Sequence, residues 1–120
     1  MWVKIGCDIQ HIPKFKSAVE KRGQTFLNTL FSAQELANND NLQSLSGLFA
    51  IKEAIMKAVN LNAGSWKNIE IIKRDSGKPE AFIEGLKLDI LSQDISISHD
   101  GEYTMAVACF LIHEKTTVNN

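Results

Sequence analysis

Apolar and polar residues alternate along the first ten positions of the chain. This period of two predicts a strand over residues 2–10 with two chemically different faces. Asp8 falls on the polar face, near the end of the strand. The other face is expected to point into a core and consists of Val3, Ile5, Cys7 and Ile9.

Helical signals follow this strand. Residues 12–22 have apolar side chains at helical spacing, with Pro13 allowed in the first turn and Gly23 as a stop. Ser32 and Glu35 form a capping-box pattern, which predicts the start of a short helix. The longest helix is predicted over residues 45–60, with an inward stripe of Leu48, Ile51, Ile55 and Val59.

Strand and turn signals dominate the second half of the chain. Residues 69–73 and 81–83 are predicted to pair through a turn. A brief helix or turn is expected over residues 86–91. Residues 94–98 and 103–112 then predict a hairpin, in which the pair Asp100 and Gly101 suits a type I′ turn.

The order of these elements predicts one α+β domain over residues 1–120, in which a small antiparallel sheet packs against one long and several short helices. The last strand is apolar on both faces, so helices or a neighbouring subunit are expected to cover it. Oligomerisation is therefore expected.

Composition narrows the class of partner. With 120 residues, 44% of them apolar, the chain suits one compact core. A net charge of -1 does not favour nucleic acid as a partner, and no apolar run approaches the length of a membrane span. Cys7 and Cys109 lie in predicted strands, so buried reduced thiols and a cytoplasmic location are expected.

Three separated groups of residues could carry chemistry. Asp8 is either a solvated strand end or a ligand for a hard cation. Glu53 and Lys57 lie four positions apart on the long helix, and spacing alone favours a surface ion pair over a site. His99 is either an exposed neighbour of a turn or a binding residue. Its sequence neighbours cannot complete a hydrolase triad, because adjacent strand residues point to opposite faces.

Five segments together resemble the holo-acyl-carrier-protein synthase family, the short type of phosphopantetheinyl transferase. They are GCDIQHI, FSAQEL, GLFAIKEAIMKAV, IEIIKRDSGKPEAFI and ISISHDGEYTMAVACF, and they cover nearly the whole chain in the family's order. The helix motif FAIKEAIMKA is the most specific of the matched patterns. The resemblance implies the 4′-phosphopantetheinyl transferase fold and a trimer with coenzyme A bound between subunits.

The resemblance also implies a reaction and its residues. The phosphopantetheine arm of coenzyme A would pass to a serine of apo-acyl carrier protein in fatty acid biosynthesis, releasing adenosine 3′,5′-bisphosphate. Asp8 and Glu53 would bind Mg²⁺ and, with Lys57, form the catalytic group. Glu53 is the candidate base, acting directly or through a water molecule. Lys57 would lie against the phosphates, and Ser98 and His99 would line the coenzyme A cleft.

Two further expectations concern binding. Leu48 stands where the family usually has arginine, so either coenzyme A binds more weakly or another cation, such as Lys52, compensates. An acidic carrier protein would dock on a basic helix face, with Lys14 as the first choice of contact; the other candidates there are Lys16, Lys21 and Arg22.

Two alternatives stay open. The chain could modify a specialised carrier domain of secondary metabolism, or it could be a non-catalytic relative that only binds coenzyme A. Assays with several apo-carriers separate them, because a specialist modifies its own carrier and a binding protein modifies none.

Overall fold

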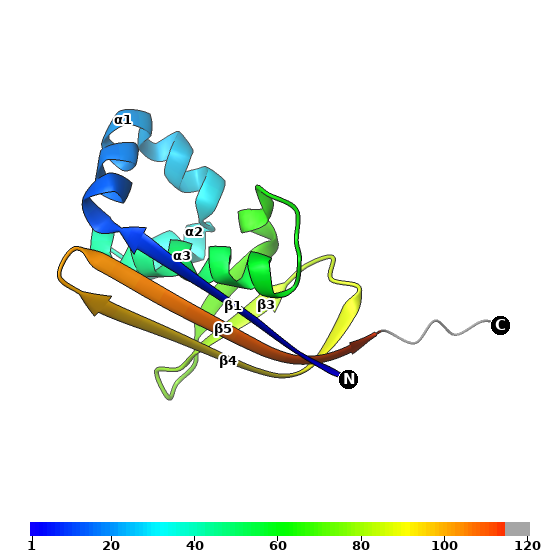
Figure 1. Ribbon diagram of the computed structural model, residues 1–120. Helices are drawn as coiled ribbons and strands as arrows, with labels where there is room; N and C mark the ends of the chain where they lie inside the picture. The colour runs from blue at the N-terminus through cyan, green and yellow to red at the C-terminus, as the bar shows by residue number, and fades with distance from the viewer. Residues whose placement is uncertain (115–120) are drawn as a thin grey trace.

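The computed structural model describes residues 1–114 and confirms the predicted α+β fold (Figure 1). The elements in chain order are β1 (Trp2–His11), α1 (Ile12–Leu30), α2 (Ala33–Asn38), α3 (Leu42–Ala58), the 3₁₀ helix η1 (Ser65–Asn68), β2 (Ile69–Lys73), β3 (Pro79–Ile83), β4 (Leu88–Asp100) and β5 (Tyr103–Glu114). Among these residues, none of the helices is long and apolar enough to cross a membrane.

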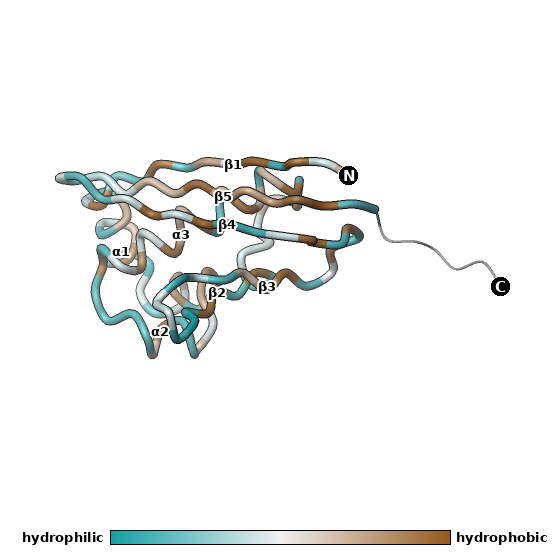
Figure 2. The backbone as a smooth tube through the Cα atoms, turned by 90° about the horizontal axis from the view of Figure 1, so that it is seen from below, coloured by the Kyte–Doolittle hydropathy of each residue, from teal (hydrophilic) through white to brown (hydrophobic). Residues whose placement is uncertain are grey.

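The strands form two antiparallel sheets. One has three strands in the order β1-β5-β4, and the other pairs β2 with β3. Figure 2 shows the three long strands as one layer, with the helices and the β2–β3 pair all on the same side of it. One face of the larger sheet is therefore covered by the rest of the chain, and its other face is open.

The core lies between α3 and the covered face of β5. The predicted inward stripe of α3 is buried as expected, and it meets side chains at every second position of β5. Burying a leucine, isoleucine or phenylalanine side chain contributes about 1.5–3 kcal/mol, so this contact stabilises the fold. The β5 residues in the core are Ala106, Ala108, Phe110 and Ile112.

The predicted boundaries that differ most from the structure are those of the first helix and of β4. The first helix does not end at Gly23: this residue, at φ 65°, forms a kink, and a second helical segment runs on to Leu30. Residues 88–91 are strand rather than helix, because β4 extends back to Leu88 and pairs with the end of β5. Pairing with a distant strand overrides the weak local signal there.

The final hairpin exists, but its turn differs from the prediction. Asp100 pairs with Tyr103, so the two loop residues are Gly101 and Glu102. Gly101 has φ 57°, and Glu102 is not among the residues with positive φ. A type I′ turn needs positive φ at both central positions, so this turn is not type I′.

The predicted orientation of β1 was also wrong. Gly6 is buried against α3, whereas Ile5 is 68% exposed on the open face of the sheet. Cys7 shares that exposed face and is a free thiol, which contradicts its predicted burial. The alternation identifies two faces, but only the tertiary fold decides which one is covered. The open face also carries Val3 and Ile9.

Gly6 permits an unusually close approach between β1 and α3. A Cβ atom at this position would lie 1.9 Å from the Ala54 carbonyl oxygen and 2.9 Å from the Ala58 amide nitrogen. Both atoms belong to the helix backbone, which cannot move aside as a flexible side chain can. The contact brings the end of β1 directly against the second half of α3.

We expect Gly6→Ala to lower the free energy of unfolding by about 3 kcal/mol, because the added methyl group must push β1 away from α3. Urea denaturation followed by circular dichroism measures this change. Gly47→Ala is a useful comparison, since Gly47 has no positive φ and a Cβ there meets only side-chain atoms, the nearest at 3.4 Å. Equal stability of Gly6→Ala and the parent protein would show that the close approach is not required.

Candidate functional site

Asp8 and Lys57 meet where β1 crosses α3. The Lys57 ammonium Nζ lies 3.2 Å from Asp8 Oδ1 and also donates to the Cys7 carbonyl oxygen at 3.0 Å. Gln10 Nε2 donates to Asp8 Oδ2 at 2.6 Å. The Asp8 side chain is only 12% exposed, while that of Lys57 is 57% exposed. A carboxylate held by two donors thus sits beneath a cation that faces solvent.

Glu53 lies one helical turn before Lys57, on the same stripe of α3. Its carboxylate does not pair with Lys57: Glu53 Oε1 instead accepts a hydrogen bond from Trp66 Nε1 at 3.1 Å. Trp66 comes from η1, which follows the long helix. The indole N–H therefore fixes the orientation of a half-buried carboxylate next to the Asp8–Lys57 pair.

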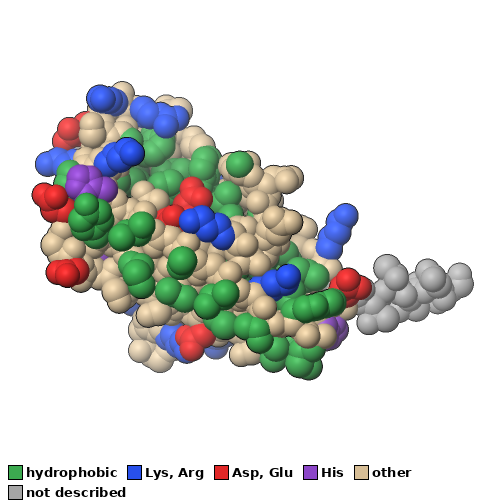
Figure 3. All heavy atoms as spheres, in the orientation of Figure 1, with side chains coloured by type: hydrophobic (Ala, Val, Ile, Leu, Met, Phe, Trp, Pro, Cys, Tyr) green, Lys and Arg blue, Asp and Glu red, His purple; other side chains and the backbone are tan. Residues whose placement is uncertain are grey.

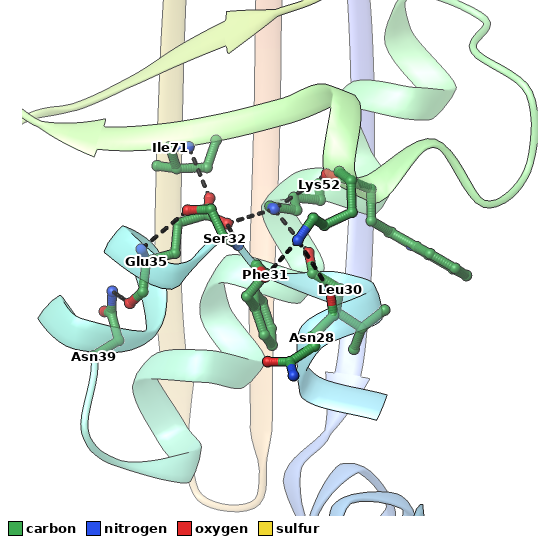
Figure 4. Close-up of polar contacts among 10 residues, drawn as sticks. Asn28, Leu30, Phe31, Ser32, Glu35, Asn39, Lys52 and Ile71 are labelled. Atoms are coloured by element: carbon green, nitrogen blue, oxygen red, sulfur yellow. Dashed lines mark hydrogen bonds and ion pairs between the residues drawn. The ribbon is translucent and has the colours of Figure 1, made fainter. Parts of the chain in front are cut away.

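Lys52 points in a different direction from Glu53, into a buried polar network (Figure 4). Its ammonium Nζ donates to Glu35 Oε1 at 2.6 Å, to the Leu30 carbonyl oxygen at 2.8 Å and to the Trp66 carbonyl oxygen at 3.1 Å. Burial lowers the pKa of Lys52 below the usual value for lysine, and the hydrogen bond to Glu35 opposes this shift.

This geometry contradicts the predicted contact between Lys52 and coenzyme A. The side chain is fully buried, and its three donors are all used inside the protein. The Glu35 carboxylate also accepts from the Ser32 and Ile71 amides, so the ion pair joins α2, α3 and β2. Lys52 is therefore a structural residue that stabilises the fold around the site.

A cavity of about 730 Å³ opens at the other end of α3, between this helix, the β2–β3 pair and β4. This volume is in the range of small-molecule sites. Leu48 and His99 both line it. Among its described lining residues, Lys73 is the one lysine or arginine, and it is exposed. The cavity could therefore accept a mainly neutral ligand surface with one anionic group near Lys73.

Comparison with known proteins decides the family. The family model of the 4′-phosphopantetheinyl transferase superfamily matches residues 4–108, which include Asp8, the α3 residues and His99. The chain belongs to this superfamily. It is also 37% identical over 113 residues to the holo-[acyl-carrier-protein] synthase of Chlorobaculum parvum, covering 88% of this chain and 96% of that protein. The synthase of Chlamydia pneumoniae is 36% identical over 119 residues, covering 91% and 97%.

Solved structures of the superfamily have the same fold. The Helicobacter pylori holo-[acyl-carrier-protein] synthase in complex with coenzyme A superposes with a TM-score of 0.81 at 29% identity, covering 89% of this chain and 99% of that one. The synthase of Neisseria meningitidis gives a TM-score of 0.79 at 27% identity, covering 90% and 97%.

The predicted site residues do not all meet in one place. Asp8, Glu53 and Lys57 cluster at the second half of α3, whereas His99 lies in the cavity by its first half. Nine residues of helix, or about 14 Å, separate Leu48 from Lys57. The predicted site residues therefore form two separate groups, one near each end of α3.

Ser98 and Lys14 lie elsewhere. Ser98 pairs with Met105 across the sheet, is exposed and is not among the residues lining the cavity, since His99 next to it points the other way. Lys14 is exposed in the first turn of α1. Both roles that the resemblance implied for these residues stay predictions.

Three polar partners were missed at the level of sequence: Gln10 beside Asp8, Trp66 beside Glu53, and Thr104 beside His99. Gln10 is two positions from Asp8 on the same strand face, so period-two spacing could have identified it. Trp66 and Thr104 carry no such local signal, because each meets its partner only through the tertiary fold.

Proposed function

We propose that this chain transfers the 4′-phosphopantetheine arm of coenzyme A to a serine of apo-acyl carrier protein, in fatty acid biosynthesis. The observation that carries this proposal is the Asp8–Lys57 pair beside Glu53, in a chain whose relatives are named holo-[acyl-carrier-protein] synthases. The coenzyme A bound in the Helicobacter pylori relative supports the choice of donor.

The reaction requires attack of the carrier serine oxygen on the β-phosphorus of coenzyme A. The bond between this phosphorus and the bridging oxygen breaks, and adenosine 3′,5′-bisphosphate leaves with the electron pair. Lys57, whose ammonium faces solvent, would offset the charge that develops on the phosphate oxygens. Glu53, oriented by Trp66, would accept the proton of the serine hydroxyl.

The carboxylates also fit a magnesium ion. Magnesium prefers oxygen ligands and is held by one or two carboxylates together with substrate phosphates and water. Among residues 1–114, no group of three or more His, Cys, Asp or Glu side chains is arranged to hold a metal. Asp8 and Glu53 would hold the ion, which when bound withdraws charge from the transferring phosphorus.

The separation of Asp8, Glu53 and Lys57 from His99 supports an active site shared between subunits. The open face of the β1-β5-β4 sheet is apolar along β1 and β5, and Figure 3 shows hydrophobic side chains gathered along these strands. Such an exposed patch marks an interaction surface. We propose a homotrimer in which this face is buried and the cavity of one subunit receives coenzyme A beside Asp8, Glu53 and Lys57 of the next.

We expect Ile5→Glu to convert the assembly into monomers and to abolish transfer, because a charge would be buried in the subunit contact. Light scattering coupled to gel filtration measures the mass. Phe82→Glu is the matched control, since Phe82 is 52% exposed on β3, outside the three-stranded sheet. An unchanged oligomeric mass for Ile5→Glu would contradict the proposed interface.

Lys14 is our proposed contact for the acidic carrier protein. It lies at the start of α1, and the strand residue Asp8 precedes that helix by only a few positions. Lys16, Lys21 and Arg22 are exposed on the same helix and would extend the basic surface. The cytoplasm is the proposed location of this reaction.

The decisive experiment is intact-mass spectrometry of apo-acyl carrier protein incubated with this protein and coenzyme A. A gain of about 340 Da, seen with Mg²⁺ and lost with excess chelator, would support both the transfer and the role of the metal. Modification of only a secondary-metabolism carrier would move the substrate to that class. Coenzyme A binding without modification of any carrier would favour the non-catalytic alternative, with Leu48 as the first residue to restore to arginine.

A further inference from the structure

A chain of buried hydroxyl groups connects α3 to His99. Ser46 Oγ donates to the Gln43 carbonyl oxygen at 2.8 Å and lies 3.0 Å from Thr104 Oγ1. Thr104 Oγ1 in turn lies 2.8 Å from His99 Nδ1. Ser46 and Thr104 are both fully buried, so water does not compete for these groups. The chain runs from the helix through β5 to the residue that lines the cavity.

The direction of each hydrogen bond follows from the number of protons. The Gln43 carbonyl can only accept, so the single hydroxyl proton of Ser46 is used there. Thr104 must therefore donate its own proton to Ser46. The remaining partner of Thr104 is His99 Nδ1, which must then carry a proton and donate it. In any other arrangement, lone pairs on two of these oxygen or nitrogen atoms would face each other inside the protein. Burial makes the free-energy cost of such a contact high.

We propose that Thr104 and Ser46 are positioning residues that hold His99 in the Nδ1–H tautomer and thereby make Nε2 the atom offered to the ligand of the cavity. Among residues 1–114, no hydrogen-bond partner of His99 Nε2 is found. The His99 ring also lies over Gly47, where a Cβ atom would be 3.5 Å from Cε1. The Thr104 hydroxyl thus holds one nitrogen of the ring, and the Gly47 backbone lies beside the ring.

This arrangement defines what His99 can recognise. Neutral His99 accepts a hydrogen bond at Nε2 from an N–H or O–H group of the ligand, and protonated His99 donates from Nε2 to a phosphate oxygen. In both states Nδ1 remains a donor to Thr104, so the ring need not turn when its charge changes. That the ligand is coenzyme A rests on the proposed function; the tautomer itself does not.

The test is the tautomer of His99, read from long-range ¹H–¹⁵N correlation spectra of the full, ¹⁵N-labelled protein at a pH where the ring is neutral. We expect Nδ1–H in the parent protein and in Thr104→Ser, which keeps a hydroxyl. Thr104→Val keeps the shape of the side chain but removes the donor and acceptor, so it should shift His99 toward Nε2–H. Nε2–H in the parent protein, or no change in Thr104→Val, would overturn the inference.

Kinetics supply a second readout. Thr104→Val should raise the KM for coenzyme A about fivefold, the effect expected for one misplaced hydrogen bond, with little change in kcat. In a His99→Ala background the same substitution should have no further effect on KM, and an equal effect in both backgrounds would overturn the coupling. If no carrier protein is modified at all, the proposed function fails, but the spectra still decide the tautomer.

Discussion

Glu53→Gln is expected to lower the rate of phosphopantetheine transfer by about a thousandfold or more. The substitution removes the negative charge that would hold the metal and the basic oxygen that would accept the serine proton. The amide oxygen of glutamine can still accept the hydrogen bond from Trp66 Nε1, so the shape of the site is kept. The rate is measured by single-turnover mass spectrometry of the carrier protein.

The control for this result is Glu84→Gln. Glu84 is exposed in the turn after β3, and its substitution should leave the rate unchanged. Thermal unfolding of Glu53→Gln should match the parent protein within a few degrees, since Glu53 is only half-buried. A transfer rate within tenfold of the parent value would remove Glu53 from the catalytic group.

The largest loss of stability is expected for Lys52→Met. The free energy of unfolding should fall by about 3–5 kcal/mol, because the substitution leaves the Glu35 carboxylate buried without its counter-charge. Two carbonyl oxygens would also lose a hydrogen-bond donor, because Leu30, at the end of α1, and Trp66, in η1, both accept from Lys52. Urea denaturation of the purified variant measures the change.

Two matched variants separate the buried charge from other effects. Lys67→Met removes an exposed lysine that donates to carbonyl oxygens of the α1–α2 segment, and it should cost about 1 kcal/mol or less. Glu35→Gln combined with Lys52→Met should be more stable than Lys52→Met alone, because neither charge then remains. A less stable double variant would mean that the ion pair does not explain the loss.

Much of the proposed catalytic group was identified from sequence, because its residues lie in recognisable motifs. Glu53 and Lys57 lie on one stripe of a helix, and the motif around them, together with the strand motif at Asp8, is shared with a known family. Spacing alone favoured a Glu53–Lys57 surface pair. The structure instead pairs Lys57 with Asp8 and Glu53 with Trp66, which are contacts between elements distant in sequence.

Lys52 is a residue whose role the sequence motif did not predict. Lys52 was suggested as the cation that replaces the family's arginine, absent at Leu48, but its side chain is buried inside the protein. Lys52 faces Glu35, which caps α2 and accepts from β2. A buried lysine is rare without a partner, and the sequence gives no indication of which carboxylate provides it.

By itself, the sequence determined the elements whose signals are local: the β1 strand, the capping box at Ser32, the long helix and the final hairpin. The tertiary structure decided which face of β1 is covered, because the close contact of Gly6 with Ala54 leaves Ile5 on the open face. It also decided the partners of each polar side chain. Periodicity and capping depend on residues a few positions apart, whereas burial and hydrogen bonding depend on which distant segments pack together.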